Sequence, residues 1–288
     1  MSRVSQAVWR CRDHVFPLGE RTLVMGIVNV TPDSFSDGGM LSDDRAAVAH
    51  GLRLAAEGAD ILDVGGESTR PGAGPVPAGE ELERVLPVIE GLHEAAPEGV
   101  ALSVDTRRPD VARAALEAGA SIVNDVTAAA DPAMFDVVAA SGAGLVLMHM
   151  LGEPRTMQDD PRYDDVVVDV RDFLAARLGA AVAAGVARDR LCVDPGIGFG
   201  KNLDHNLRLL HDIASFGELR VPVMVGASRK RFLGQLTDVD EPSARVEGTA
   251  GAVAWCAANG VDVVRVHDVL QMARVARVVD AIAHGAPR

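Results

Sequence analysis

Short apolar runs rich in β-branched residues alternate with longer stretches rich in Ala, Leu and Glu along most of the chain. Short apolar runs are typical of buried strands, and the longer stretches have the length and composition of helices. The apolar runs predict strands at 23–28, 60–64, 101–104, 121–124, 144–148, 191–194, 221–225 and 262–266. Helices are predicted after them at 43–57, 79–95, 108–118, 132–141, 165–185, 203–215, 243–259 and 269–284.

This alternation predicts an α/β fold with a parallel sheet, because continuously apolar strands separated by helices are covered on both faces. Several predicted helices end at a glycine, as at Gly58 and Gly119, which permits a left-handed helix cap. No shift in composition marks a second domain, so residues 23–288 are predicted to form a single domain. A closed TIM (β/α)8 barrel accounts for the number of units, and a doubly wound open sheet is the alternative.

Residues 1–22 are charged and irregular in pattern. We predict that they form an N-terminal extension, such as a short hairpin or a cover that closes one end of the barrel. No function is attached to them.

The net charge of −13 and a pI near 5.0, with no long block of like charges, disfavour a nucleic-acid or anionic-membrane partner. An anionic ligand would therefore need locally placed cations. The 3 cysteines are widely spaced, without the pairing typical of zinc sites. No apolar leader or membrane-spanning stretch stands out, so a cytoplasmic location is expected.

In a barrel, catalytic groups lie at the carboxyl ends of the strands and in the loops that follow. Polar residues stand there after nearly every predicted strand: Asn29, Asp63, Asp105, Asn124, His149, Asp194, Lys230, Arg265 and His267. Carboxylates accept from ring N–H and amino groups, while Asn and Lys donate to ring oxygen and nitrogen. The set therefore favours a heterocyclic ligand, and its basic members favour phosphate, pyrophosphate or carboxylate.

Two alternatives concern single residues of this set. An acidic residue at a strand end can instead cap the next helix, and this alternative stays open for Asp105. His149 is predicted as the polar end of a core strand rather than as a metal ligand. The stretch from Gly196 to Lys201 is neither a Walker loop nor a dinucleotide fingerprint, and no GxSxG or HExxH motif occurs.

The chain resembles the dihydropteroate synthase family in a series of motifs that occur in the family's order between residues 23 and 284. These are MGIVNVTPDSFSDGG at 25–39, DVGGESTRPG at 63–72, SVDT at 103–106, ND at 124–125, MH at 148–149, DPGIGFGK at 194–201, GASRKRFLG at 226–234 and RVHD at 265–268. One departure follows Asn124: the chain has alanines at 128–130, where family members generally carry glycines.

The resemblance implies a transferase that joins 6-hydroxymethyl-7,8-dihydropterin pyrophosphate to p-aminobenzoate and releases pyrophosphate, in a homodimeric TIM barrel that sulfonamides inhibit. It assigns the pterin to Asp105, Asn124, Asp194 and Lys230. It assigns the pyrophosphate to Arg265, His267 and, through Mg2+, Asn29. It assigns p-aminobenzoate to Thr69, Arg70, Phe199 and Ser228, beneath a flap carrying Asp33 and Phe35. Asp33, Phe35, Lys230 and Arg265 are the expected catalytic residues.

Two other functions remain open. Pterin-binding barrels also transfer methyl groups from methyltetrahydrofolate, although such proteins have no need for the flap or for the Ser228–Lys230 motif. A non-catalytic pterin-binding paralogue is the second alternative, against which the complete flap sequence argues.

Overall fold

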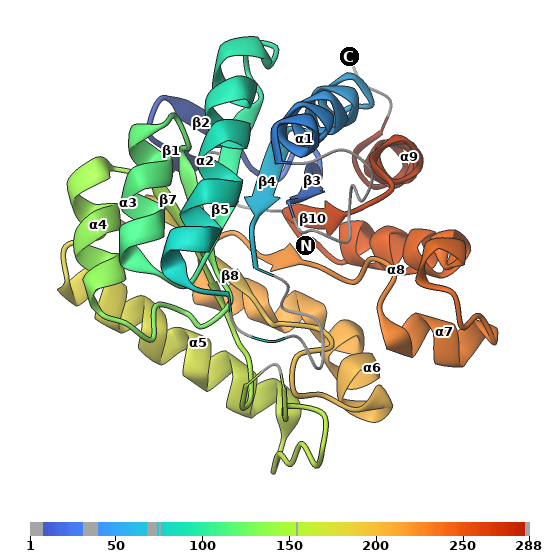
Figure 1. The fold of residues 1–288 in the computed structure, drawn as a ribbon. Helices are drawn as coiled ribbons and strands as arrows, with labels where there is room; N and C mark the ends of the chain where they lie inside the picture. The colour runs from blue at the N-terminus through green and yellow to red at the C-terminus, as the bar shows by residue number, and fades with distance from the viewer. Residues whose placement is uncertain (1–7, 31–39, 68–73, 75, 154, 286–288) are drawn as a thin grey trace.

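The computed structural model describes residues 8–30, 40–67, 74, 76–153 and 155–285. Eight parallel strands follow one another in the order β8-β7-β6-β5-β4-β3-β10-β9. A bridge between Val193 on β8 and Val223, next to β9, joins the two ends of this sheet. The sheet therefore closes into a barrel surrounded by helices (Figure 1), which confirms the TIM barrel and overturns the doubly wound alternative.

The strands are short and mostly buried, as expected for a sheet covered on both faces. They are β3 (Leu23–Asn29), β4 (Ile61–Gly65), β5 (Ala101–Asp105), β6 (Ile122–Asp125), β7 (Gly144–Met148), β8 (Leu191–Asp194), β9 (Met224–Val225) and β10 (Val263–Val266). The seventh strand was predicted over 221–225 but has only two residues. Pro222 lacks the N–H that a longer ladder would need.

The helices flank the barrel in the predicted order, with one addition. They are α1 (Met40–Ala56), α2 (Ala78–Ala95), α3 (Pro109–Glu117), α4 (Ala133–Ser141), α5 (Val166–Ala183), α6 (Leu203–His211), α7 (Arg231–Thr237), α8 (Val246–Ala258) and α9 (Val269–His284). The extra helix α7 follows the loop after β9. Within the described part of the chain, no helix has both the length and the apolar character needed to cross a membrane.

A two-stranded hairpin precedes the barrel, β1 (Val8–Cys11) paired antiparallel with β2 (His14–Pro17). Its side chains Trp9, Cys11 and Phe16 join one apolar cluster with Leu23, Ile61, Ala101, Ile122, Cys192 and Val263. Those partners lie at or near the amino ends of the barrel strands. Trp9 is fully buried and donates from Nε1 to the Arg190 carbonyl at 3.0 Å. The hairpin thus lies at the end of the barrel opposite the polar strand ends.

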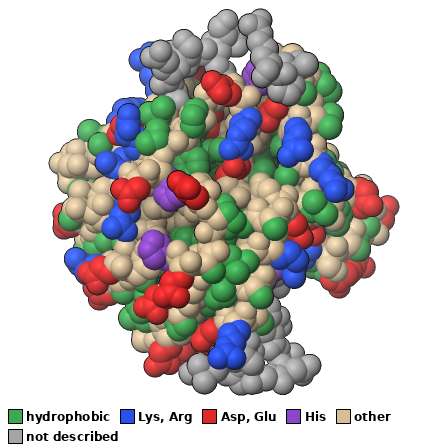
Figure 2. Space-filling model, turned by 90° about the horizontal axis from the view of Figure 1, so that it is seen from above, with side chains coloured by type: hydrophobic (Ala, Val, Ile, Leu, Met, Phe, Trp, Pro, Cys, Tyr) green, Lys and Arg blue, Asp and Glu red, His purple; other side chains and the backbone are tan. Residues whose placement is uncertain are grey.

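A second, larger apolar cluster fills the layer between strands and helices. On the face seen in Figure 2, basic and acidic side chains are interspersed with apolar ones instead of forming a block of one sign.

Candidate active site

The inward face of the barrel changes from apolar to polar along each strand. Side chains two residues apart point to the same face of a strand. Ile61, Ile122, Cys192 and Val263 belong to the apolar cluster beneath the hairpin. Two residues further along the same strands stand Asp63, Asn124, Asp194 and Arg265. The chain therefore places a polar layer inside the barrel at its carboxyl end.

Arg265 links three strands of this layer. Its Nε donates to Asp63 Oδ2 at 2.7 Å, and its Nη2 donates to Asp105 Oδ2 at 2.8 Å. Asn124 Nδ2 donates to the same Asp63 oxygen at 3.0 Å. Asp63 is fully buried and Asp105 nearly so, so the guanidinium neutralises carboxylates that water does not solvate.

Asp105 does not cap the following helix. The residue before α3 is Arg108, and no side chain caps that helix end. The helix-cap alternative for Asp105 is therefore wrong, and its carboxylate belongs to the polar layer.

Asp194 and Lys230 lie close enough to Arg265 for its charge to lower the pKa of both groups. Asp194 Oδ1 accepts from the Gly196 N–H at 2.7 Å. Lys230 Nζ donates to the Ile197 carbonyl and lies 4.1 Å from the centre of the Phe199 ring. The loop after β8 thus contacts Lys230 through both its backbone and its aromatic side chain.

Burial disfavours the charged forms of Asp105, Asp194 and Lys230. It raises the pKa of Asp105 to about 7, although Arg265 opposes the rise. Burial also raises the pKa of Asp194, with Lys230 as the main opposing group. It lowers the pKa of Lys230 to about 7, against the effect of Asp194. A ligand that brings N–H donors to the carboxylates would stabilise their charged forms.

The loops after β9 and β10 are joined by two adjacent pairs. Ser228 Oγ and His267 Nδ1 are 3.0 Å apart, and the His267 N–H donates to the same hydroxyl at 3.2 Å. Arg229 donates to both carboxylate oxygens of Asp268, at 3.0 and 2.5 Å. The structure therefore brings Ser228 and His267 together.

The loop after β6 has alanines at 128–130 where family members generally carry glycines. Side chains elsewhere in the chain hold this loop in place. Ala128 and Ala129 both have positive φ, 55° and 56°, which glycine would adopt without strain. Arg177 on α5 donates to the carbonyls of both alanines, and Asp125 accepts from the Ala129 N–H at 3.1 Å. These contacts hold the two strained residues, so Asn124 keeps its place in the layer.

His149 follows β7 and is buried. Its Nδ1 lies 2.9 Å from Nζ of the buried Lys201. Burial, and secondarily Lys201, lowers the pKa of His149 to about 3, so the imidazole is neutral at physiological pH. His149 therefore contacts the loop after β8 through Lys201.

Asn29 ends β3, half-buried. Four predicted site residues, Asp33, Phe35, Thr69 and Arg70, lie outside the described residues. Sequence reasoning gave no role to Lys201, which the structure places beside the polar layer, and it named Asp63 only as one of the polar strand ends. An acidic residue between apolar neighbours in a predicted strand was the available signal for Asp63.

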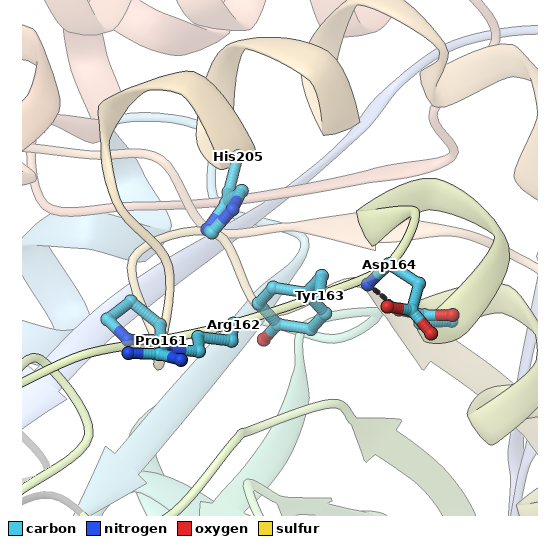
Figure 3. Close-up of a pocket in the computed structure, with 6 residues that line it drawn as sticks. Pro161, Arg162, Tyr163, Asp164 and His205 are labelled. Carbon is cyan, nitrogen blue, oxygen red and sulfur yellow. Dashed lines mark hydrogen bonds between the residues drawn. The ribbon is translucent and has the colours of Figure 1, made fainter.

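A separate surface pocket of about 550 Å³ lies outside the barrel mouth. It is lined by Pro161, Arg162, Tyr163, Asp164, Asp169 and His205 (Figure 3), none of which is a predicted site residue. Tyr163 connects it to the loop after β8 by donating to the Gly200 carbonyl at 2.8 Å. The pocket therefore borders the loop after β8, the same loop that contacts Lys230.

Comparisons with known proteins identify the family of the chain. Residues 25–267 match the family model described as "Pterin binding enzyme". Dihydropteroate synthase of Escherichia coli strain K12 is 45% identical over 258 residues, which cover 90% of each chain.

Two solved structures of dihydropteroate synthase from Xanthomonas albilineans are similar throughout. One, with 4-aminobenzoic acid, has a TM-score of 0.91 at 49% identity, covering 97% of this chain and 99% of the other. The other, in complex with 7,8-dihydropteroate, has a TM-score of 0.86 at 46% identity, covering 96% and 99%. The chain therefore belongs to the pterin-binding enzyme family, among the dihydropteroate synthases.

Proposed function

We propose that this chain condenses 6-hydroxymethyl-7,8-dihydropterin pyrophosphate with p-aminobenzoate to give 7,8-dihydropteroate and pyrophosphate, a step of folate biosynthesis. One observation carries the proposal: buried carboxylates and cations alternate inside the carboxyl end of the barrel. This arrangement suits a flat heterocycle that has donors and acceptors on its edge and an anionic leaving group. The relatives that contain 4-aminobenzoic acid and 7,8-dihydropteroate support the same substrates and product.

The pterin is assigned to Asp105, Asn124, Asp194 and Lys230. Its N3–H and 2-amino group present two parallel donors, which match a carboxylate as an arginine guanidinium does. Gly226 supports a flat ligand at Asp194, because a Cβ there would lie 4.0 Å from Asp194 Oδ2 and 3.8 Å from Arg265 Cβ. The missing side chain leaves room over both groups.

The pyrophosphate is assigned to Arg265, His267 and Asn29. Mg2+ is proposed as the cofactor, since this small cation binds through one or two protein oxygens together with substrate phosphates and water. Among the described residues, no group of three or more His, Cys, Asp or Glu could hold a metal ion. The carboxamide oxygen of Asn29 fits the remaining requirement, and bound Mg2+ would neutralise charge on the leaving pyrophosphate.

The p-aminobenzoate is assigned to Phe199 and Ser228 among the described residues, with Thr69, Arg70, Asp33 and Phe35 outside them. We propose a dissociative substitution in which the bond to pyrophosphate breaks before the amine nitrogen attacks the pterin methylene. Arg265 and His267 stabilise the leaving charge, while the barrel holds the two substrates in line. The attacking amine needs alignment more than a strong base, which agrees with the lack of a nucleophile motif.

The direct test is pyrophosphate release by the purified chain with Mg2+, the pterin pyrophosphate and p-aminobenzoate. We expect release only when all three are present. Tight binding of the pterin pyrophosphate without release would favour the non-catalytic paralogue. Methyl transfer from methyltetrahydrofolate without p-aminobenzoate-dependent release would favour the methyltransferase.

We also propose that the enzyme is a homodimer that pairs through α8 and α9. Trp255 on α8 is 46% exposed, and Val278 and Ile282 on α9 are 60% and 79% exposed. Replacing Ile282 with Glu should raise the dimer dissociation constant by at least tenfold in sedimentation velocity, because the interface would bury a charge. Val15→Glu on the hairpin, where the parent side chain is 46% exposed, is the control. A monomeric parent chain would refute the assignment.

A cytoplasmic location remains part of the proposal. The three cysteines are buried free thiols, as is common in a reducing compartment.

A further inference from the structure

The loop from Gly196 to Lys201 is held by an unusual series of side chains. Side-chain donors bind its successive carbonyls from Ile197 to Lys201: Lys230 binds Ile197, Gln158 binds Gly198 at 2.6 Å, Lys201 binds Phe199 at 2.9 Å, Tyr163 binds Gly200 at 2.8 Å and Asn206 binds Lys201 at 3.4 Å. Loops usually satisfy such carbonyls with water. In this loop, side chains of the protein bind the five carbonyls instead.

Within this series Lys201 makes the connection to the barrel. Its Nζ lies 2.9 Å from His149 Nδ1 and donates to the carbonyls of Phe199 and His149 at 2.9 and 3.4 Å. Three polar groups thus surround Lys201 Nζ, and two of them belong to His149 in the loop after β7. The side chain is only 2% exposed.

The two loops are packed too closely to tolerate a shift. A Cβ on Gly196 would clash with the His149 carbonyl, and a Cβ on Gly200 would clash with the Leu151 carbonyl. A Cβ on Gly198 would lie 2.9 Å from Lys230 Cδ. The loop therefore fits between the β7 loop on one side and Lys230 on the other.

We infer that Lys201 is a positioning residue: it ties the Gly196–Lys201 loop to His149 and thereby sets Phe199 and the Ile197 carbonyl against Lys230. The identity of the ligand that Lys230 then binds rests on the proposed function.

Stability alone does not account for a lysine here. The three groups around its Nζ are neutral, and burial lowers the pKa of Lys201 well below its usual value, with the charge of Lys230 adding to the effect. The fold thus disfavours a charge on this side chain. The benefit of Lys201 therefore lies in the fixed geometry of the loop.

The test uses Lys201→Met, which keeps the aliphatic stem and removes the donors. We expect hydrogen–deuterium exchange of residues 196–201 to rise at least tenfold. We expect the dissociation constant of the pterin pyrophosphate, measured by titration calorimetry, to rise about tenfold, since small misplacements of binding groups are costly. Tyr163→Phe removes one hydroxyl at the rim of the outer pocket (Figure 3) and should change exchange and affinity in the same direction by a smaller factor.

Arg12→Met is the matched control. Arg12 also donates to two backbone carbonyls, those of Leu116 and Ala120 at 2.6 and 2.8 Å, but beside the hairpin. Its loss should leave exchange of 196–201 and pterin affinity unchanged.

Wild-type exchange at 196–201 in both Lys201→Met and Tyr163→Phe would overturn the inference. So would faster exchange in Lys201→Met at wild-type pterin affinity. If the parent chain bound no pterin, the proposed function would fail while the exchange data still decided whether Lys201 fixes the loop.

Discussion

Replacing Lys230 with Ala should weaken binding of the pterin pyrophosphate on the order of 100-fold while the barrel stays folded. Losing one member of a buried, hydrogen-bonded charge pair costs about 2–5 kcal/mol in binding. Lys230 stands at the start of α7 with its Nζ against Phe199 and the Ile197 carbonyl, so its truncation removes a donor from the polar layer and leaves the barrel core intact. Titration calorimetry measures the affinity, and the far-ultraviolet spectrum checks the fold.

The pH dependence of the affinity offers a sharper test of the same residue. Asp105 has its pKa raised to about 7 by burial, so its carboxylate becomes available as the pH rises through that value. Lys230 has its pKa lowered to about 7 by burial, so its ammonium is lost over the same range. Wild-type affinity should therefore pass through a maximum near neutral pH.

In Lys230→Ala the alkaline decline should disappear because no ammonium remains to titrate. The pKa of Asp194 should rise further, since Lys230 is the main group that lowers it, so a second carboxylate besides Asp105 should contribute to the acid side. An unchanged affinity, or an alkaline decline that survives in the variant, would show that Lys230 does not bind the pterin. Titration of the free pterin alone separates its own ionisation from that of the protein.

The eight barrel strands and eight of the helices could be predicted because the strands are apolar runs and several helices end at a glycine. Helix α7 could not, because its seven residues directly follow the Ser228–Lys230 loop and contain a glycine. That glycine has a tertiary reason. A Cβ on Gly234 would clash with the Val239 carbonyl, so the residue serves packing rather than a turn.

The sequence predicted which polar residues stand at the strand ends, but not the contacts between them. Alternation along each strand places Asp105, Asn124 and Asp194 on the inward face once the barrel is assumed. The partners of Arg265 could not be predicted, since Asp63 and Asp105 stand 202 and 160 positions earlier in the chain. Only closure of the barrel brings them together.

The alanines after Asn124 illustrate the same limit. The sequence shows that glycines are missing there, which suggests a stiffer loop. The compensation comes from Arg177, whose bonds to Ala128 and Ala129 span 49 and 48 positions. No local signal connects that arginine to the loop.

Replacing Asp63 with Ala should give a large loss of stability, about 3 kcal/mol in the free energy of unfolding. Breaking a buried ion pair from one side typically costs about 3–5 kcal/mol because the other charge stays behind. Arg265 retains Asp105 and is 21% exposed, which places the expected value at the lower end of that range. Denaturant titration followed by fluorescence measures it.

Glu218→Ala is the control for this prediction, because it removes an ion pair of the same chemistry at the surface. Glu218 is 71% exposed and its partner Arg171 28%, so its loss should cost less than about 1 kcal/mol. Asp63→Ala should also weaken pterin binding, because Asn124 and Arg265 share Asp63 Oδ2 as their acceptor. If Asp63→Ala lost no more stability and no more pterin affinity than Glu218→Ala, the contact between Asp63 and Arg265 would contribute nothing to either property. The polar layer would then depend on one carboxylate fewer than the geometry indicates.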